Sequence, residues 1–148
     1  MTSKLVIGLD GKSSGQRALD YGEQLAAKIG DCELLVTYII EWSPYSFQTP
    51  EENAQRHKRR EEEISTAMER IVTPAVSKLT QSGAQARGIV RHGDVADALN
   101  DIAKEEEADQ IIICRSSEGG IAKRLFGSST ANLVMSASVP VTVINPGV

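Results

Sequence analysis

The chain has 148 residues, 41% of them hydrophobic, which suits one globular domain over residues 1–148 that buries about 70% of its unfolded surface. Its net charge of −4 argues against nucleic acid as a partner, because electrostatic binding to phosphates needs a basic face. The N-terminal apolar stretch ends at Asp10 and is too short for a signal peptide or a membrane span, so we expect a cytoplasmic protein with no membrane partner.

The first half of the chain alternates short apolar runs with longer helical patterns. Residues 4–10 predict a strand and residues 14–29 a helix with one apolar face. Residues 32–40 form a nearly unbroken apolar run, which is typical of a parallel strand covered on both faces. Residues 41–50 contain two prolines and three aromatic residues and predict a long loop.

A second helix is expected from about residue 50 to residue 81. Pro74 lies inside this helix and should kink or divide it near residues 72–73, because proline removes a backbone hydrogen bond and clashes with the preceding turn. The rest of the chain predicts a strand at 84–90, a helix at 94–107, a strand at 109–114, a helix at 128–137 and a strand at 139–145. This alternation predicts an α/β fold, with an open five-stranded parallel sheet and helices on both faces.

Residues 8–15 read G-L-D-G-K-S-S-G and contain the end of a phosphate-binding P-loop. The complete signature requires a glycine at position 6, where this chain has Val6 inside an apolar run typical of a strand. We therefore interpret the segment as a turn after the first strand, in which Ser13 or Ser14 caps the following helix.

Three further patterns favour structural interpretations. Cys32 and Cys114 have no C-x-x-C spacing, which favours a reduced pair over a disulfide or a metal site. The charge run at 56–63 has three glutamates directly after its basic residues and is typical of a solvated helix face. His92 lies close to Asp94, but no G-x-S-x-G turn aims a serine, so we expect Asp94 to cap a helix and assign no catalytic residue.

The segment at 111–130 indicates a binding function. It joins a predicted strand to a predicted helix through a loop with three glycines, the last of which is Gly127. Ser128 and Ser129 then stand at the predicted helix start, where free backbone N–H groups and hydroxyls suit an anion or a phosphate. Ordinary helix capping by Ser128 is the alternative.

Five stretches that together span residues 4–145 resemble the universal stress protein family. They are V-I-G-L-D-G-K-S-S-G-Q-R-A-L-D-Y-G, H-G-D-V-A-D-A-L, E-A-D-Q-I-I-I, G-G-I-A-K-R-L-F-G-S-S-T-A-N-L-V and S-V-P-V-T-V-I. The resemblance implies a Rossmann-like sheet with strand order 3-2-1-4-5 and a homodimer formed through the last strand, at 141–145. It also implies that ATP or AMP binds, with Mg²⁺ as an optional companion of the phosphates.

The nucleotide signature of that family is G-x-x-G, nine residues, then G-[ST]. Anchored on Gly127 and Ser128, its first two glycines fall where this chain has Cys114 and Ser117, whose side chains add bulk and weaken the implied site. The Ser117 hydroxyl and Arg115 nevertheless offer groups for a phosphate. The nucleotide-binding residues implied by the resemblance are Gly8, Leu9, Asp10, Tyr38, Ile113, Cys114, Arg115, Ser117, Gly127, Ser128 and Ser129.

Three functions remain open on the sequence alone. The first is a homodimeric regulatory protein of the stress response that binds ATP or AMP, with Asp10 accepting hydrogen bonds from the ribose or adenine. The second, favoured by Cys114 and Ser117, is a nucleotide-free relative that acts as a dimeric interaction module for an unknown protein partner. The third is a slow ATP hydrolase, for which the sequence supplies no clear general base and no carboxylate pair for a metal.

Overall fold

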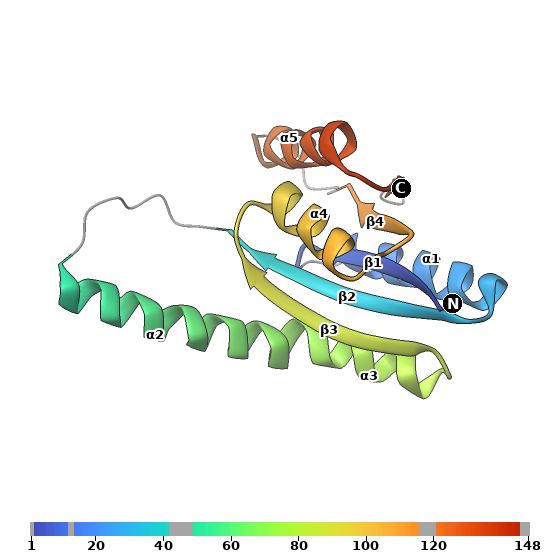
Figure 1. Ribbon diagram of the computed structural model, residues 1–148, viewed down its shortest axis with the longest axis horizontal. Helices are drawn as coiled ribbons and strands as arrows, with labels where there is room; N and C mark the ends of the chain where they lie inside the picture. Colours follow the sequence, from blue (N-terminus) through green and yellow to red (C-terminus); the bar gives the residue numbers. More distant parts are fainter. Residues whose placement is uncertain (1, 12–13, 42–48, 116–120, 146–148) are drawn as a thin grey trace.

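The structure, a computed structural model, describes residues 2–11, 14–41, 49–115 and 121–145. Its strands are β1 (Ser3–Leu9), β2 (Cys32–Ile40), β3 (Gln85–His92), β4 (Gln110–Cys114) and β5 (Val141–Ile144). They form one parallel sheet in the order β3-β2-β1-β4-β5, which confirms the expected fold class and strand order (Figure 1). The helices are α1 (Ser14–Ile29), α2 (Pro50–Ala67), the π-helical turn η1 (Met68–Val72), α3 (Thr73–Gln81), α4 (Val95–Glu105) and α5 (Ile121–Ser136).

The element bounds follow the sequence patterns closely, with one clear exception. Helix α1 and strand β2 begin and end where predicted, and β3 extends two residues further, to His92. The helix start predicted at Ser128 is wrong, because α5 begins at Ile121. The run I-A-K-R-L-F that precedes Gly127 contains good helix formers, so the glycine and serine there lie inside the helix. Most of the predicted loop at 41–50 lies outside the described residues.

The central strand β1 divides the core into two layers. Its side chains alternate between the two faces of the sheet, so Leu5 and Ile7 pack on one side and Val6 on the other, all fully buried. The first layer lies under α1, η1 and α3, and the second lies under α4 and α5. This two-sided burial explains why the strands read as continuous apolar runs.

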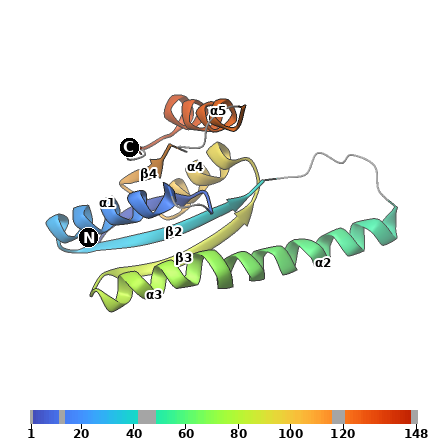
Figure 2. The ribbon, with the colours of Figure 1, turned by 180° about the vertical axis from the view of Figure 1, so that it is seen from behind.

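The helices α2, η1 and α3 follow one another along the β3 side of the sheet, and the N-terminal part of α2 extends beyond the sheet (Figures 1 and 2). The predicted division at Pro74 is confirmed: the helix widens into the π-turn just before it, with the Thr73 N–H donating to the Met68 carbonyl. Val72 of this turn is fully buried against Gly88 on β3, where an added Cβ would lie 2.3 Å from Val72 Cγ1. The glycine therefore lets the turn approach the sheet.

The start of α4 and its attachment to the sheet are fixed by polar contacts. The Asp94 carboxylate accepts a hydrogen bond from the Asp97 backbone N–H at 3.0 Å, which confirms the predicted cap. The Arg91 guanidinium on β3 contacts both carboxylate oxygens of Glu105, with Nη1 to Oε1 at 3.1 Å, and this contact lowers the pKa of Glu105. His92 instead pairs with Glu63 on α2, its Nε2 lying 2.9 Å from Oε2. The Arg91 contact therefore ties α4 to β3, and the His92 contact ties α2 to the end of the same strand.

Candidate functional site

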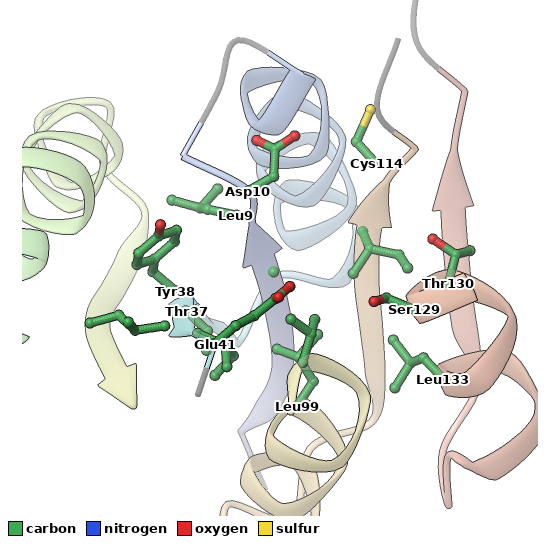
Figure 3. Close-up of a pocket in the computed structure, with 15 residues that line it drawn as sticks. Leu9, Asp10, Thr37, Tyr38, Glu41, Leu99, Cys114, Ser129, Thr130 and Leu133 are labelled. Carbon is green, nitrogen blue, oxygen red and sulfur yellow. The ribbon is translucent and has the colours of Figure 1, made fainter. Parts of the chain in front are cut away.

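A cavity of about 330 Å³ opens at the carboxyl ends of β1, β2 and β4, between α4 and α5 (Figure 3). The chain passes from β1 to β2 on one side, whereas β4 lies on the other side of β1, so the cavity sits where the strand order reverses. Open α/β sheets bind their ligands at this point. The lining residues are Gly8, Leu9, Asp10, Thr37, Tyr38, Ile39, Ile40, Glu41, Val95, Leu99, Ile113, Cys114, Ser129, Thr130 and Leu133.

The floor of the cavity is formed where Gly8 pairs with Thr37 of β2 and Ile113 of β4. A Cβ atom added at Gly8 would lie 3.0 Å from Ile113 Cγ2 and 3.2 Å from Leu99 Cδ1. The missing side chain therefore lets Leu99 of α4 approach the sheet. Thr37 is fully buried in this floor, and its hydroxyl donates a hydrogen bond to the Leu35 carbonyl at 3.1 Å. Its hydrogen-bond donor is therefore already used within the protein.

The walls of the cavity are apolar and come from two helices. Leu99 of α4 is 2% exposed and Leu133 of α5 is 1% exposed, so both are held by core packing. Val95 lies one turn before Leu99 on the same face of α4, just after the Asp94 cap. Well-packed apolar walls with a few polar groups at the rim are typical of sites for small organic ligands.

The polar groups of the cavity are two carboxylates, of Asp10 and Glu41, and the hydroxyls of Tyr38, Ser129 and Thr130. Figure 3 shows them distributed around the opening, with Tyr38 of β2 and Glu41, which follows β2, on one side and Ser129 and Thr130 of α5 on the other. No lysine, arginine or histidine lines this cavity within the described part of the chain. The carboxylates, which only accept hydrogen bonds, therefore lie at the β1 and β2 ends, and hydroxyls that can donate lie on both sides, with Ser129 and Thr130 on the α5 side.

Cys114 lies at the end of β4, on the rim of the cavity, and its thiol donates to the Arg115 carbonyl at 3.4 Å. Burial raises the pKa of the Cys114 thiol, and the negative charge of Asp10 raises it further, while Arg17 and Arg115 oppose the shift. The thiol is therefore neutral near pH 7 and acts as a small apolar group. Both cysteines of the chain are free.

The cavity brings together most of the residues singled out in the sequence, namely Gly8, Leu9, Asp10, Tyr38, Ile113, Cys114 and Ser129. Arg115 follows directly and is exposed, with its backbone N–H donating to the Ile144 carbonyl at 3.0 Å. Ser117 lies outside the described residues, as do the side chains at positions 127 and 128. Because α5 begins at Ile121, Ser128 and Ser129 lie inside the helix, and the anion site expected at a helix start does not form there.

Sequence reasoning missed the helix residues Val95, Leu99 and Leu133 and the carboxylate of Glu41. The helix residues carry the spacing of an ordinary core face, and nothing in that spacing distinguishes a core contact from a cavity wall. Glu41 could have been found, since it follows β2 directly as Asp10 follows β1. The rule that ligands meet strand ends applies equally to both carboxylates.

A second cavity of about 320 Å³ lies on the opposite face of the sheet, between α1 and the helices η1 and α3. Arg70 of η1 and Lys78 of α3 line it, and none of its described lining residues carries a carboxylate. Leu9 lines both cavities. Among the residues that the structure describes, no cluster of three or more histidine, cysteine, aspartate or glutamate side chains could hold a metal ion. None of the described helices is long and apolar enough to cross a membrane.

Known proteins resemble this chain along nearly its whole length. The model of the universal stress protein family matches residues 1–145. Universal stress protein Rv1636 of Mycobacterium tuberculosis is 31% identical over 147 residues, which cover 95% of this chain and 94% of that protein.

Solved structures share the fold. A universal stress protein in complex with cAMP matches with a TM-score of 0.69 and 23% identity, covering 99% of this chain and 98% of that one. A universal stress protein family protein from Arabidopsis thaliana with AMP bound matches with a TM-score of 0.63 and 17% identity, covering 98% of this chain and 92% of that one.

Proposed function

This chain belongs to the universal stress protein family, and from that premise we propose that it is an adenine-nucleotide-binding regulatory protein of the stress response. The ligand is AMP or ATP, held in the cavity between α4 and α5. The protein acts in the cytoplasm, as a homodimer. Its proposed role is regulatory, with the nucleotide bound as an effector in this cavity.

The observation that carries this proposal is the position and chemistry of the cavity. It lies where the strand order reverses, its walls suit a flat apolar base, and its rim offers carboxylates for ribose hydroxyls. Structures of the same fold contain AMP or cAMP. Mg²⁺ would accompany only a ligand with several phosphates, since the described residues form no metal cluster of their own.

Two measurements test nucleotide binding. Mass spectrometry of the protein purified without added nucleotide should reveal AMP or ATP, and calorimetric titration should give a saturable site for AMP. The variant Ser129→Phe places a ring in the cavity from α5 and should reduce AMP binding at least 100-fold, because the ring occupies space that the nucleotide needs. Ala131→Phe, at an exposed position of the same helix, is the matched control and should bind normally. Equal AMP affinity in both variants would contradict the site.

The homodimer is proposed from the free edge of the sheet. Strand β5 lies at one edge of the sheet. The backbone carbonyls of Pro140 and Ile144 point toward β4, where they accept hydrogen bonds from the backbone N–H groups of Ile111 and Arg115. Because hydrogen-bonding direction alternates along a strand, the backbone groups of Val141 and Val143 point away from the sheet. A second copy that pairs antiparallel through residues 141–145 would use these groups and cover the edge.

Substitution at the outward-pointing positions tests this interface. Val143→Pro removes an outward N–H and leaves the hydrogen bonds to β4 intact, so it should convert the dimer to a monomer without unfolding the sheet. Light scattering should then give the 16.0 kDa mass of one chain, against twice that mass for the unmodified protein. A monomeric unmodified protein at micromolar concentration would refute the interface.

A second candidate function is a nucleotide-free dimeric interaction module. One observation favours it: α5 presents two exposed apolar side chains, Val134 at 53% and Met135 at 85% exposure. The Cys114 side chain at the end of β4 adds to this case, because it occupies space at the cavity rim. Absence of any AMP or ATP binding, together with an intact dimer, would favour this function.

A further inference from the structure

The polar groups of the cavity are ordered along the edge of the sheet. Glu41 follows β2, Asp10 follows the neighbouring strand β1, and Ser129 and Thr130 of α5 lie beyond β4. Adjacent strands are about 4.8 Å apart, so these groups are separated along one direction across the opening. A nucleotide also has a fixed linear order, from base through ribose to phosphate.

The chemistry of these groups decides which end of a nucleotide each can hold. Carboxylates accept hydrogen bonds and repel phosphates, whereas hydroxyls can donate to phosphate oxygens. None of the described lining residues is a cation, and the two arginines that act on the rim, Arg17 and Arg115, influence the Cys114 thiol on the β4 side. The phosphate therefore belongs at the Ser129 and Thr130 end, and the Glu41 carboxylate at the β2 end favours a part of the ligand that donates hydrogen bonds.

Glu41 is the acceptor at the β2 end. Its side chain is exposed, and it makes no hydrogen bond or ion pair with any residue in the described part of the chain. Figure 3 shows it extending from the end of β2 over the cavity, whose lining it shares with Leu99. A carboxylate forms a charge-assisted hydrogen bond with an N–H donor that is stronger than a bond between neutral groups.

We propose that Glu41 determines the base specificity of the site by accepting a hydrogen bond from the exocyclic amine of adenine. The inference rests on the proposed nucleotide-binding function and deepens it. Base, ribose and phosphate then face Glu41, Asp10 and the α5 hydroxyls in that order. Adenine is selected because its amine donates a hydrogen bond to the carboxylate. A base with a keto group at the same ring position would place a second hydrogen-bond acceptor against the carboxylate, and no hydrogen bond could form.

The test compares AMP with purine riboside 5′-monophosphate, which differs from AMP in lacking the 6-amino group. Calorimetric titration should show AMP binding about ten-fold or more tightly to the unmodified protein, the scale expected for a charge-assisted hydrogen bond. In Glu41→Ala this ratio should fall below about two-fold, and in Glu41→Gln, which keeps an uncharged acceptor, it should be intermediate. The ratio cancels the repulsion between Glu41 and the phosphate, because both ligands carry the same phosphate.

The control variant is Glu69→Gln, which makes the same charge change at an exposed position of η1 outside the cavity lining. It should keep the ten-fold ratio. An unchanged ratio in Glu41→Ala overturns the inference while leaving nucleotide binding intact. If Glu41→Ala instead removes a preference for AMP over 2′-deoxy-AMP, the carboxylate accepts a hydrogen bond from the ribose 2′-hydroxyl and the inference is wrong. Failure of the unmodified protein to bind AMP at all removes the proposed function as well.

Discussion

Two of the cavities at the carboxyl edge of the sheet have nearly the same volume, about 330 and 320 Å³, yet their linings carry opposite charges. The cavity under α4 and α5 has the carboxylates of Asp10 and Glu41, and the cavity under η1 and α3 has the cations of Arg70 and Lys78. Leu9 at the end of β1 lines both. The strands therefore fix where cavities form, and the residues that follow the strands or lie on the covering helices fix their charge.

This difference shows why size alone does not identify a ligand. Both cavities have apolar lining residues, such as Leu99 in the first and Leu19 in the second. The second differs in its polar groups, which are the amide of Gln16 and the cations of Arg70 and Lys78. A base with a sugar suits the first lining, because both apolar surface and hydrogen-bond acceptors are available. The comparison can be tested by changing one cavity while leaving the other intact.

The largest effect is expected at the floor of the first cavity. Gly8→Val adds a side chain that must displace Leu99, since even a Cβ would lie 3.2 Å from Leu99 Cδ1. We expect a loss of about 1–3 kcal/mol in the free energy of unfolding and no measurable AMP binding. Urea unfolding and calorimetric titration measure the two effects.

The matched change in the second cavity is Ala75→Leu, at a position that lines this cavity and not the first. The larger side chain should cost about 1–3 kcal/mol in the free energy of unfolding, and AMP binding should survive. Equal loss of AMP binding in both variants would mean that the two cavities do not act separately.

Alkylation of Cys114 should report occupancy of the first cavity. Because burial and the Asp10 charge raise the pKa of the thiol, less thiolate is present at pH 7 than in a free cysteine. Iodoacetamide should therefore react more slowly than with a free thiol, roughly ten-fold for each unit by which the pKa is raised, and faster as the pH rises toward that pKa.

AMP should slow the alkylation of Cys114 further by covering it. Peptide mass spectrometry at several pH values measures this rate, and Cys32, which is 3% exposed, serves as the internal unreactive thiol. Rapid alkylation at pH 7 that AMP does not affect would contradict the placement of the ligand.

The smallest effect concerns long-range charge. Glu41→Gln should strengthen ATP binding relative to adenosine by about three-fold at 0.1 M salt, because it removes one negative charge that repels the phosphates from the other end of the cavity. Lys78→Gln, which removes a charge from the second cavity, should change this ratio far less, since the sheet separates it from the ligand. Titrations at two salt concentrations check both statements, and a larger effect of Lys78→Gln would place the phosphates in the second cavity.

Strong local signals made most of the fold predictable. The apolar run from Cys32 to Ile40 gave both ends of β2, and Pro74 located the division of the long helix. The start of α5 was missed because Gly127 and Ser128 form a common helix start, and a glycine inside a helix costs only about 1 kcal/mol against the good helix formers before it.

The candidate site was predictable to the extent that it depends on strand ends. Asp10 and Cys114 could be placed at the cavity because every parallel strand of the sheet ends at the same edge. Leu99 and Leu133 could not, because the part of an apolar helix face that borders a cavity depends on how the helices cross the sheet, which spacing does not encode. Charge at the rim is readable from the sequence once the strand ends are known, as Glu41 shows.

The π-helical turn at Met68–Val72 absorbs one extra residue between α2 and α3. A π-turn completes one turn with one residue more than an α-turn, whereas each residue of a regular α-helix advances it by about 100°. Deleting one residue from this turn would therefore restore an α-turn and leave α2 in nearly the same rotational phase, while α3 kept its contact with β3. Deleting one residue from α2 itself would instead rotate the side chains before it by about 100°, so the turn is the place where the long helix tolerates a change of length.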